Sequence, residues 1–380
     1  DNEEYLERFE ESPGEPWRPV LTGSDIQRYN VNWPNRYVKY GDWLARNWQN
    51  SDFYERDKIA IRETSDRITA ALDNQDRYLL STLYSVYYHE QFDNEESLEY
   101  LIAIINSNAA QFYMHQLVFA LTEGAFTKAR TNHYQRLPVP ISDDDELYNP
   151  GIGESLAHSS EEEERDSRTK REWMISAVNT IQSAKANRSA LNLSLLDHLG
   201  AYDDGQTLSE IGLTQPPKDA ADSVLQQTAE QKPNLRVGDA DVVRESTSTV
   251  EIRLTARYKP EDDDFETDQW GYTETEPLPA LRITDLSETE ADLIAAFVPV
   301  AVDEAGGFAG FRETATKTNS LVDRLRGLTL PRVDDVEAGL ESYVETKERA
   351  DELDEKIQRT DDLIDEIVYE LYGLTDEEIE

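Results

Sequence analysis

The chain has 380 residues, with 37 Lys and Arg against 79 Asp and Glu, which gives a formal net charge of −42. It contains no cysteine, which excludes disulfides and thiolate metal sites, and no run of about 18 apolar residues that could cross a membrane. With 38% hydrophobic residues it can form a real core, as one large domain or as two to three ordinary ones.

The first 170 residues are predicted to hold one domain between two acidic segments. Residues 1–16 contain Pro and Gly and are predicted to be a connector, and residues 143–170 are predicted to be an acidic linker. Within residues 17–142 we expect short strands and a helix. Alternating β-branched or aromatic residues predict strands over residues 36–40, 58–63 and 78–88, and helical spacing predicts a helix over residues 97–113.

The second half is predicted to contain a helical spacer, an insertion and a helical C-terminus. Helical spacing indicates the spacer over residues 171–200, and residues 201–330 change in character to a small α+β insertion of unknown role. Residues 331–380 are predicted to be helical. Their apolar stripe suits a helix hairpin or a two-helix spacer; its members are Leu353, Ile357, Ile364, Ile367 and Leu371. The predicted fold class is therefore α+β.

Two local patterns support the predicted insertion. Apolar and polar residues alternate from Val250 to Lys259, which predicts a half-buried strand that ends at Pro260. A second strand near residues 281–283 would complete a hairpin. Ser287 and Glu290 then have the spacing of a capping box, which predicts the start of a helix.

The acidic residues are unevenly distributed along the chain. Residues 17–89 carry 10 basic and 9 acidic residues, and residues 101–142 carry 3 basic and 1 acidic residue. We attribute the acidity elsewhere mainly to a halophilic, high-salt habitat. The two neutral windows indicate a surface that meets an anionic partner, because a carboxylate coat would repel phosphate. DNA or RNA is the first candidate.

No catalytic site is predicted in this chain. An amino-methyltransferase needs Asn or Asp before Pro-Pro and an aromatic residue, whereas the nearest match reads Gln215-Pro216-Pro217-Lys218. Glu345-Thr346-Lys347 resembles part of a nuclease motif but lies in a predicted helix, and the five His show no ligand spacing. Because the first residue is Asp, we expect the chain to be a piece of a longer polypeptide.

Arginine and aromatic residues alternate between residues 28 and 77. Arginine can bind phosphate or read guanine with two hydrogen bonds, and aromatic rings can stack on bases. Lys128 and Arg130 lie beside Thr127 in a loop-like stretch suited to phosphate contact. The alternative for any single residue is that the arginine pairs with a nearby Asp and that the aromatic ring belongs to the core.

Four segments, in order, resemble the TaqI-like C-terminal specificity domain of N6-adenine DNA methyltransferases from restriction-modification and phage-defence systems, here of haloarchaeal type. Residues 23–29 resemble its opening Gly-x-Asp-Ile-x-Arg-Tyr motif, and residues 58–62 its Lys-Ile-x-x-Arg strand. Residues 101–107 resemble its Leu-Leu-Ala-Ile-Leu-Asn-Ser helix. Phe-Thr-Lys and Leu-Pro-Val-Pro, at residues 126–128 and 137–140, resemble its closing segment. Residues 190–330 depart from this pattern, so their role is open.

The resemblance implies that the chain recognises a target in double-stranded DNA, in the cytoplasm, for an upstream methyltransferase domain that binds S-adenosylmethionine. That domain would belong to the same polypeptide or to a separate subunit. A non-enzymatic specificity subunit that recruits a methyltransferase is the first alternative, and a helical scaffold with a buried protein interface is the second. The predicted DNA-contacting residues are Gly23, Asp25, Arg28, Tyr29, Arg36, Lys58, Arg62, Thr127, Lys128 and Arg130.

Overall fold

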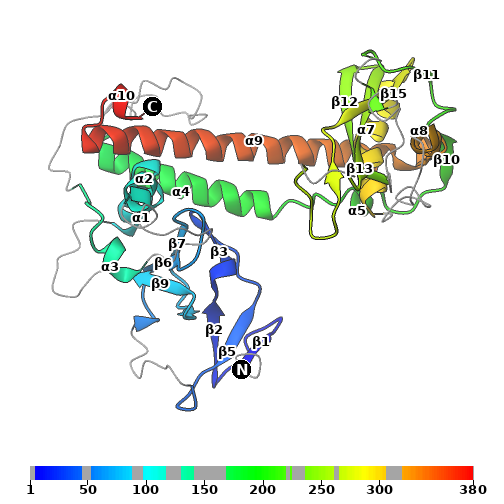
Figure 1. Cartoon of the computed structure of the whole chain (residues 1–380). Helices are drawn as coiled ribbons and strands as arrows, with labels where there is room; N and C mark the ends of the chain where they lie inside the picture. The colour runs from blue at the N-terminus through cyan, green and yellow to red at the C-terminus, as the bar shows by residue number, and fades with distance from the viewer. Residues whose placement is uncertain are drawn as a thin grey trace. The chain divides into compact units, whose positions relative to one another are not determined.

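The computed structural model shows an α+β fold, as predicted (Figure 1). It describes residues 5–44, 53–87, 97–116, 130–140, 168–219, 223–224, 236–260, 265–304 and 319–379. The chain divides into two compact units. Unit 1 comprises residues 1–190 and 350–380, and unit 2 comprises residues 191–349. Within the described residues, no helix combines the length and apolar character needed to span a membrane.

Unit 1 begins with two small sheets. The first has the strand order β1-β5-β2-β8, with β2 and β8 parallel and the other neighbours antiparallel. Its strands are β1 (Leu6–Arg8), β2 (Trp17–Leu21), β5 (Arg36–Lys39) and β8 (Tyr78–Leu79). The second is antiparallel, with β6 (Lys58–Arg62) between β7 (Ala70–Asp73) and β9 (Leu83–Val86). A short hairpin of β3 (Ile26–Gln27) and β4 (Asn30–Val31) completes the strands.

The predicted strands over residues 36–40 and 58–63 are confirmed by β5 and β6. In place of the one strand predicted over residues 78–88, the described residues up to 87 contain two strands, β8 and β9. A turn separates them, closed by the hydrogen bond from Leu83 N–H to Leu80 O at 3.0 Å, and it carries exposed Ser81 and Thr82. Residues 6–8, which we expected to be part of a connector, form the edge strand β1 against β5.

The helix predicted over residues 97–113 is interrupted at Ser107, giving α1 (Leu98–Asn106) and α2 (Asn108–Met114). Ser107 has an extended backbone, and its Oγ accepts from Ala110 N–H at 3.2 Å as the N-cap of α2. The side chain of Asn106 binds both Ala70 N–H and Ala70 O at 3.0 Å, which ties the end of α1 to β7. A serine cap thus outweighs the continuous apolar spacing. The short helix α3 (Thr131–Tyr134) follows.

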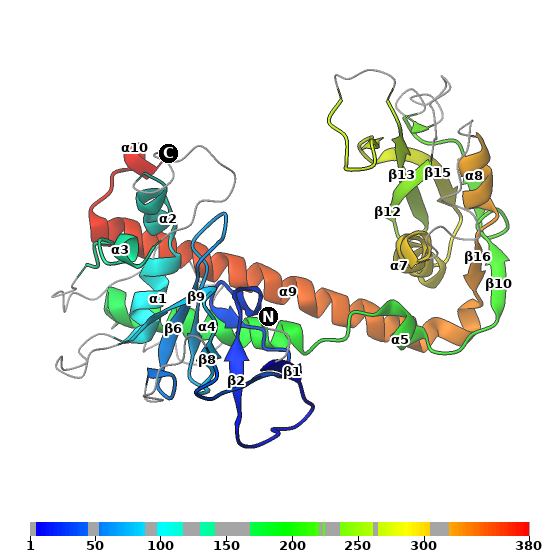
Figure 2. The same cartoon turned by 60° about the horizontal axis from the view of Figure 1, so that its bottom comes forward.

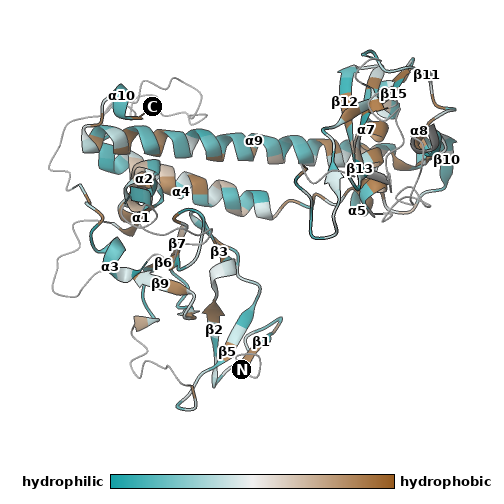
Figure 3. Cartoon of the chain, viewed as in Figure 1, coloured by the Kyte–Doolittle hydropathy of each residue, from teal (hydrophilic) through white to brown (hydrophobic). Residues whose placement is uncertain are grey.

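Helix α4 (Lys170–Ser189) runs antiparallel to the last part of α9 (Val333–Tyr372), as Figures 1 and 2 show. Lys170 pairs with Glu370 at 3.0 Å, and Arg188 pairs with Asp354 at 2.9 Å. Hydrophilic and hydrophobic residues alternate along both helices in Figure 3, as expected for helices with one buried face. A helix hairpin within residues 331–380 is wrong, because α9 is one continuous helix of 40 residues. The last part of α9 forms a two-helix arrangement with α4 instead.

The main core of unit 1 lies among the β7-β6-β9 sheet, α1, α4 and α9. The buried residues of this core include Ile59, Ile61, Ile102, Ile104, Met174, Val178, Ile181, Ile364, Ile367 and Val368. Helix α4 ends earlier than the prediction for residues 171–200, and a separate α5 (Leu195–Leu199) begins in unit 2, capped by Ser194. Helix α10 (Asp376–Ile379) closes unit 1.

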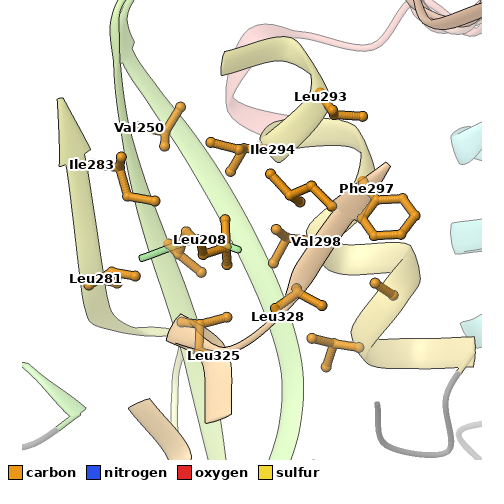
Figure 4. Packing of buried hydrophobic residues seen from close by; sticks show 14 of the residues in the cluster. Leu208, Val250, Leu281, Ile283, Leu293, Ile294, Phe297, Val298, Leu325 and Leu328 are labelled. Atoms are coloured by element: carbon orange, nitrogen blue, oxygen red, sulfur yellow. The ribbon is translucent and has the colours of Figure 1, made fainter. Parts of the chain in front are cut away.

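Unit 2 is built on a five-stranded sheet covered by helix α7 (Glu288–Glu304). Figure 4 shows Ile294 and Val298 of α7 directed toward Val250 and Ile283 of the sheet. The strands are β11 (Leu213–Gln215), β12 (Arg236–Ser246), β13 (Thr249–Tyr258), β14 (Thr273–Glu274) and β15 (Leu278–Thr284). A second sheet pairs β10 (Asp204–Thr207) with β16 (Thr329–Pro331), and α8 (Asn319–Arg326) precedes β16.

Three local predictions in this unit are confirmed. Strand β13 ends before Pro260, β15 pairs with it antiparallel, and Ser287 and Glu290 form the capping box. Unit 2 is wider than the predicted insertion at residues 201–330. The reason is that Leu195 and Leu340, outside that range, belong to the same buried core.

Replacing Ile181 by Ala should destabilise unit 1. Ile181 is fully buried in the core that joins α1, α4 and α9. A Leu or Ile to Ala change at such a site costs about 2–5 kcal/mol. Urea-dependent hydrogen exchange of peptides from α1 and α4 measures the loss locally. Asn179→Ala, at an exposed position of α4, is the matched control and should change stability by less than about 0.5 kcal/mol. Equal stability of the two variants would contradict this packing.

Candidate nucleic-acid interface

The opening motif folds into a tight turn held by Asp25, in a short 3₁₀ helix over Gly23–Asp25. Asp25 is buried, and one carboxylate oxygen accepts from Thr22 N–H at 2.7 Å, Thr22 Oγ1 at 2.9 Å and Arg36 Nη1 at 2.6 Å. An ionised carboxylate only accepts hydrogen bonds, so Asp25 is suited to these donors and not to phosphate. Asp25 and Arg36 thus fasten the turn to β5.

Three turns meet at one end of the two sheets. Gly23 N–H donates to Thr82 Oγ1 at 3.0 Å, and Glu63 N–H donates to Thr82 O at 3.0 Å. These bonds join the turn at residues 22–25, the turn at residues 63–69 and the turn at residues 80–82. We call this region the turn cluster. It places Gly23 close to the end of β6, where Arg62 lies.

Arg28 forms a bidentate ion pair with Asp361 of α9. Its guanidinium also donates to Asn106 O at 2.6 Å, and only 18% of the Arg28 side chain and 13% of the Asp361 side chain are exposed. Lys185 Nζ donates to Arg28 O at 2.7 Å, and burial lowers the pKa of Lys185. The side chain and carbonyl of Arg28 therefore join the β3–β4 hairpin to both α4 and α9.

Tyr29 and Lys58 are also internal. Tyr29 is buried, has a left-handed backbone with φ of 62°, and donates its N–H to Ala70 O at 2.8 Å. Burial raises the pKa of Tyr29 well above its ordinary value. Lys58 is 0% exposed, pairs with Asp73 at 2.7 Å and donates to Tyr54 O at 2.8 Å. A fully buried, paired lysine cannot reach a DNA backbone without unfolding the strand, so its role is structural.

Four other arginines between residues 17 and 142 are placed differently. Within the part of the chain that the structure describes, they make no ion pair with a carboxylate; they are Arg62, Arg67, Arg130 and Arg136. Arg62 is half-buried, and its Nε has no hydrogen-bond partner among the described residues. Arg130 is exposed at the start of α3, where its N–H donates to His133 Nδ1 at 3.1 Å. The predicted contacts Thr127 and Lys128 lie outside the described residues.

Several aromatic rings of the neutral window pack against one another. Tyr54 stacks on Tyr78 with ring centroids 4.3 Å apart, and Tyr40 meets Tyr78 edge to face at 4.8 Å. Trp33 contacts Tyr37 at 5.3 Å and donates its Nε1–H to Val20 O at 3.1 Å. These rings follow the alternative stated above, that aromatic residues belong to the core. Trp43 differs, because it is 51% exposed.

An apolar cavity of about 510 Å³ lies beside α2. Its walls come from α2, the segment after α3 and the C-terminal end of the chain; they include Phe112, Tyr113, Leu137, Pro138, Tyr369, Tyr372 and Ile379. Tyr113 and Tyr372 direct their hydroxyls to backbone carbonyls, those of Arg136 and Pro138. Besides the tyrosines, Asn108 and Glu378 are the polar residues of a mostly apolar lining. The described residues contain no group of three His, Asp or Glu that could hold a metal ion.

The sequence did not reveal the partners of the motif residues. Asp361 lies 333 positions after Arg28, and Asp365 lies 257 positions after its partner Asn108. Both acids look like ordinary members of an acidic helix in the sequence. The one available signal was the i, i+4 spacing that puts Asp361 and Asp365 on the same face of α9.

Replacing Arg28 by Met distinguishes a structural role from a DNA-contact role. Losing one partner of a buried pair costs about 3–5 kcal/mol, and the partial exposure of this pair reduces the expected loss to about 2–4 kcal/mol. Chemical denaturation measures it. Arg359→Met, in the exposed Arg359–Glu355 pair, should stay within about 0.5 kcal/mol of the parent. Unchanged stability together with weaker DNA binding would identify Arg28 as a contact residue instead.

Comparison with known proteins bears on the first third of the chain. Residues 18–139 match the family model of the TaqI-like C-terminal specificity domain. This confirms the resemblance over the segment from β2 to just beyond α3, which includes the turn cluster, Arg62, Arg67, Arg130 and Arg136. No curated protein matches the chain.

Proposed function

We propose that the chain is the DNA target-recognition part of a site-specific adenine-N6 DNA methyltransferase, in a restriction-modification or phage-defence system. The match of residues 18–139 to a specificity domain carries this proposal. The methyltransferase domain, which would bind S-adenosylmethionine, lies upstream in the same polypeptide or in a separate subunit. The chain would then bind duplex DNA and present the target adenine to that domain.

The distribution of charge supports DNA as the partner. In a chain with 79 acidic residues, most buried arginines could find a carboxylate, as Arg28 and Arg36 do. Arg62 and Arg130 have none among the described residues. A guanidinium without a carboxylate partner is a strong donor. Phosphate or guanine in DNA can supply the hydrogen-bond acceptor. Among the predicted contacts that the structure describes, these two arginines support the proposal most directly.

The methylation pattern of the host tests the enzymatic part of the proposal. Deleting the gene that encodes the chain should remove one N6-methyladenine sequence motif from the host genome. Long-read sequencing of native DNA measures this, and re-expression of the intact gene is the control. If every methylated motif persists in the deletion strain, the methyltransferase assignment fails.

Direct binding tests the recognition part. The Arg62→Ala, Arg130→Ala double variant should bind duplex DNA about tenfold or more weakly than the parent chain. Each lost phosphate contact should also reduce the slope of log affinity against log salt by about 0.9. Fluorescence anisotropy over a salt series measures both quantities.

The matched control for that experiment removes two arginines that pair with carboxylates. Arg332 pairs with Asp203 and Arg359 pairs with Glu355, and both pairs are exposed. The Arg332→Ala, Arg359→Ala double variant has the same net charge as the test variant and should retain parental affinity. Equal losses in the two double variants would show that net charge, and not a defined interface, governs the binding.

A further inference from the structure

One face of α2 is fastened to the turn at residues 63–69. Gln111 and Phe112 lie three and four positions after Asn108, so both share a face of the helix with it. Arg67 Nη2 donates to Asn108 Oδ1 at 2.9 Å, and Ile68 N–H donates to Gln111 Oε1 at 2.7 Å. The Arg67 guanidinium is therefore held beside the first turn of α2, one helical turn from Phe112.

Phe112 is the most exposed large hydrophobic side chain among the described residues, with 67% of its surface accessible. A basic residue lies at each end of its helix. Arg67 binds the first residue of α2, and at the other end Tyr113 Oη donates to Arg136 O at 2.9 Å. Arg67 and Arg136 make no ion pair within the described ranges. An exposed ring on a helix that binds the Arg67 side chain, and whose Tyr113 contacts the backbone of Arg136, fits a partner that has both flat apolar groups and anionic groups.

We propose that Arg67, Asn108 and Phe112 form a second DNA-contact site, in which Arg67 binds a backbone phosphate while Phe112 packs against a base step. The inference rests on the proposed function and adds a site beyond the predicted contacts. Residues 101–142 carry three basic residues and one acidic residue in a chain of net charge −42, which favours DNA over an acidic protein partner. Apolar rings inserted at base steps are a known device for kinking DNA.

Asp365 of α9 positions this site from beneath. Its Oδ1 accepts from Asn108 N–H at 2.7 Å, and its Oδ2 accepts from Asn108 Nδ2 at 2.7 Å. An ionised carboxylate accepts only, so the amide nitrogen of Asn108 must face Asp365 and the amide oxygen must face Arg67. Asp365 therefore sets the orientation of the group that holds Arg67, and it acts as a positioning residue.

The protonation of Asp365 gives this role a measurable signature. Burial, opposed by the hydrogen bond from Asn108 N–H, raises the pKa of Asp365 to about 6; the neighbouring Asp361 also raises it, whereas Arg28 and Arg67 lower it. The hydroxyls of Tyr29 and Tyr369 also feel the charge of Asp365. A protonated Asp365 presents an O–H donor, which favours the opposite orientation of the Asn108 amide and leaves Arg67 without its acceptor.

DNA affinity should therefore fall as the pH drops below about 6. Protonation of surface carboxylates has the opposite effect, because it makes the chain less negative and strengthens DNA binding. A fall in affinity at low pH therefore cannot come from net charge, and it is the result expected from the positioning role.

The binding test uses the full chain and a duplex selected from a random pool by the parent chain. Arg67→Ala should weaken binding about fivefold or more, and Phe112→Ala about tenfold, since stacking on a base is worth about 1–3 kcal/mol. The controls are Arg359→Ala and Phe265→Ala; Phe265 is also exposed, but it lies in unit 2. With 2-aminopurine at successive positions of the duplex, the parent should raise fluorescence at one step, and Phe112→Ala should not.

The positioning test measures affinity at pH values on both sides of 6. The parent should lose affinity on the acidic side, and so should Asp362→Asn, an exposed neighbour of equal charge change. Asp365→Asn should have low affinity at every pH and no acid-side loss. If Asp365→Asn does not fold, the comparison of the parent with Arg67→Ala remains, because Arg67→Ala should lack the acid-side loss.

The outcomes separate this inference from the proposed function. If the parent binds the duplex, and Arg67→Ala and Phe112→Ala bind equally well, the second site is refuted and the target-recognition role stands. If the parent selects no duplex at all, both the second site and the recognition role fail. A monotonic gain of affinity with acidification in the parent would refute the role of Asp365.

Discussion

The arrangement of unit 1 depends on the ion pair between Arg28 and Asp361. Arg28 lies in the turn of the β3–β4 hairpin, and Asp361 lies on α9, which begins in the other unit. With both side chains largely buried, neither charge is well solvated unless the other is in place. The β3–β4 hairpin is therefore stable only when α9 packs against it. The hydrogen bond from Lys185 to Arg28 O ties the hairpin to α4 in the same way.

This dependence separates the residues that identify the domain from the residues able to contact DNA. The opening motif supplies Asp25, Arg28 and Tyr29; Asp25 and Arg28 have ion-pair partners inside the protein, and Tyr29 is buried. These residues fix the positions of the turn cluster and the sheets relative to each other. Among the described residues, the arginines without a carboxylate partner include Arg62, at the end of β6, and Arg130, at the start of α3. A rigid inner network of this kind suits a surface that must keep its shape when it meets DNA.

Much of the fold could be predicted, because strand alternation and helix caps act over a few residues. Strand β13 and the capping box at Ser287 are local features of this kind. The break at Ser107 was missed, since the apolar spacing continues through it and only the cap interrupts the helix. Contact roles were harder to predict. Lys58 and Arg62 belong to one strand and have the same charge. Lys58 is buried and pairs with Asp73, whereas Arg62 has no carboxylate partner among the described residues. This difference depends on other segments of the chain, which the strand pattern does not reveal.

The acidity of the chain acquires a second meaning from this geometry. Carboxylates that coat a surface keep phosphate away, but Asp361 and Asp365 are directed inward from α9 to the groups that present the arginines. Their charge is compensated locally by Arg28 and by the amide of Asn108, so little of it is available to repel DNA. The same residue type that makes the rest of the chain a poor DNA ligand is therefore used within unit 1 to hold basic side chains in place. The neutral windows mark the segments that receive this support, and not only the segments that carry the contacts.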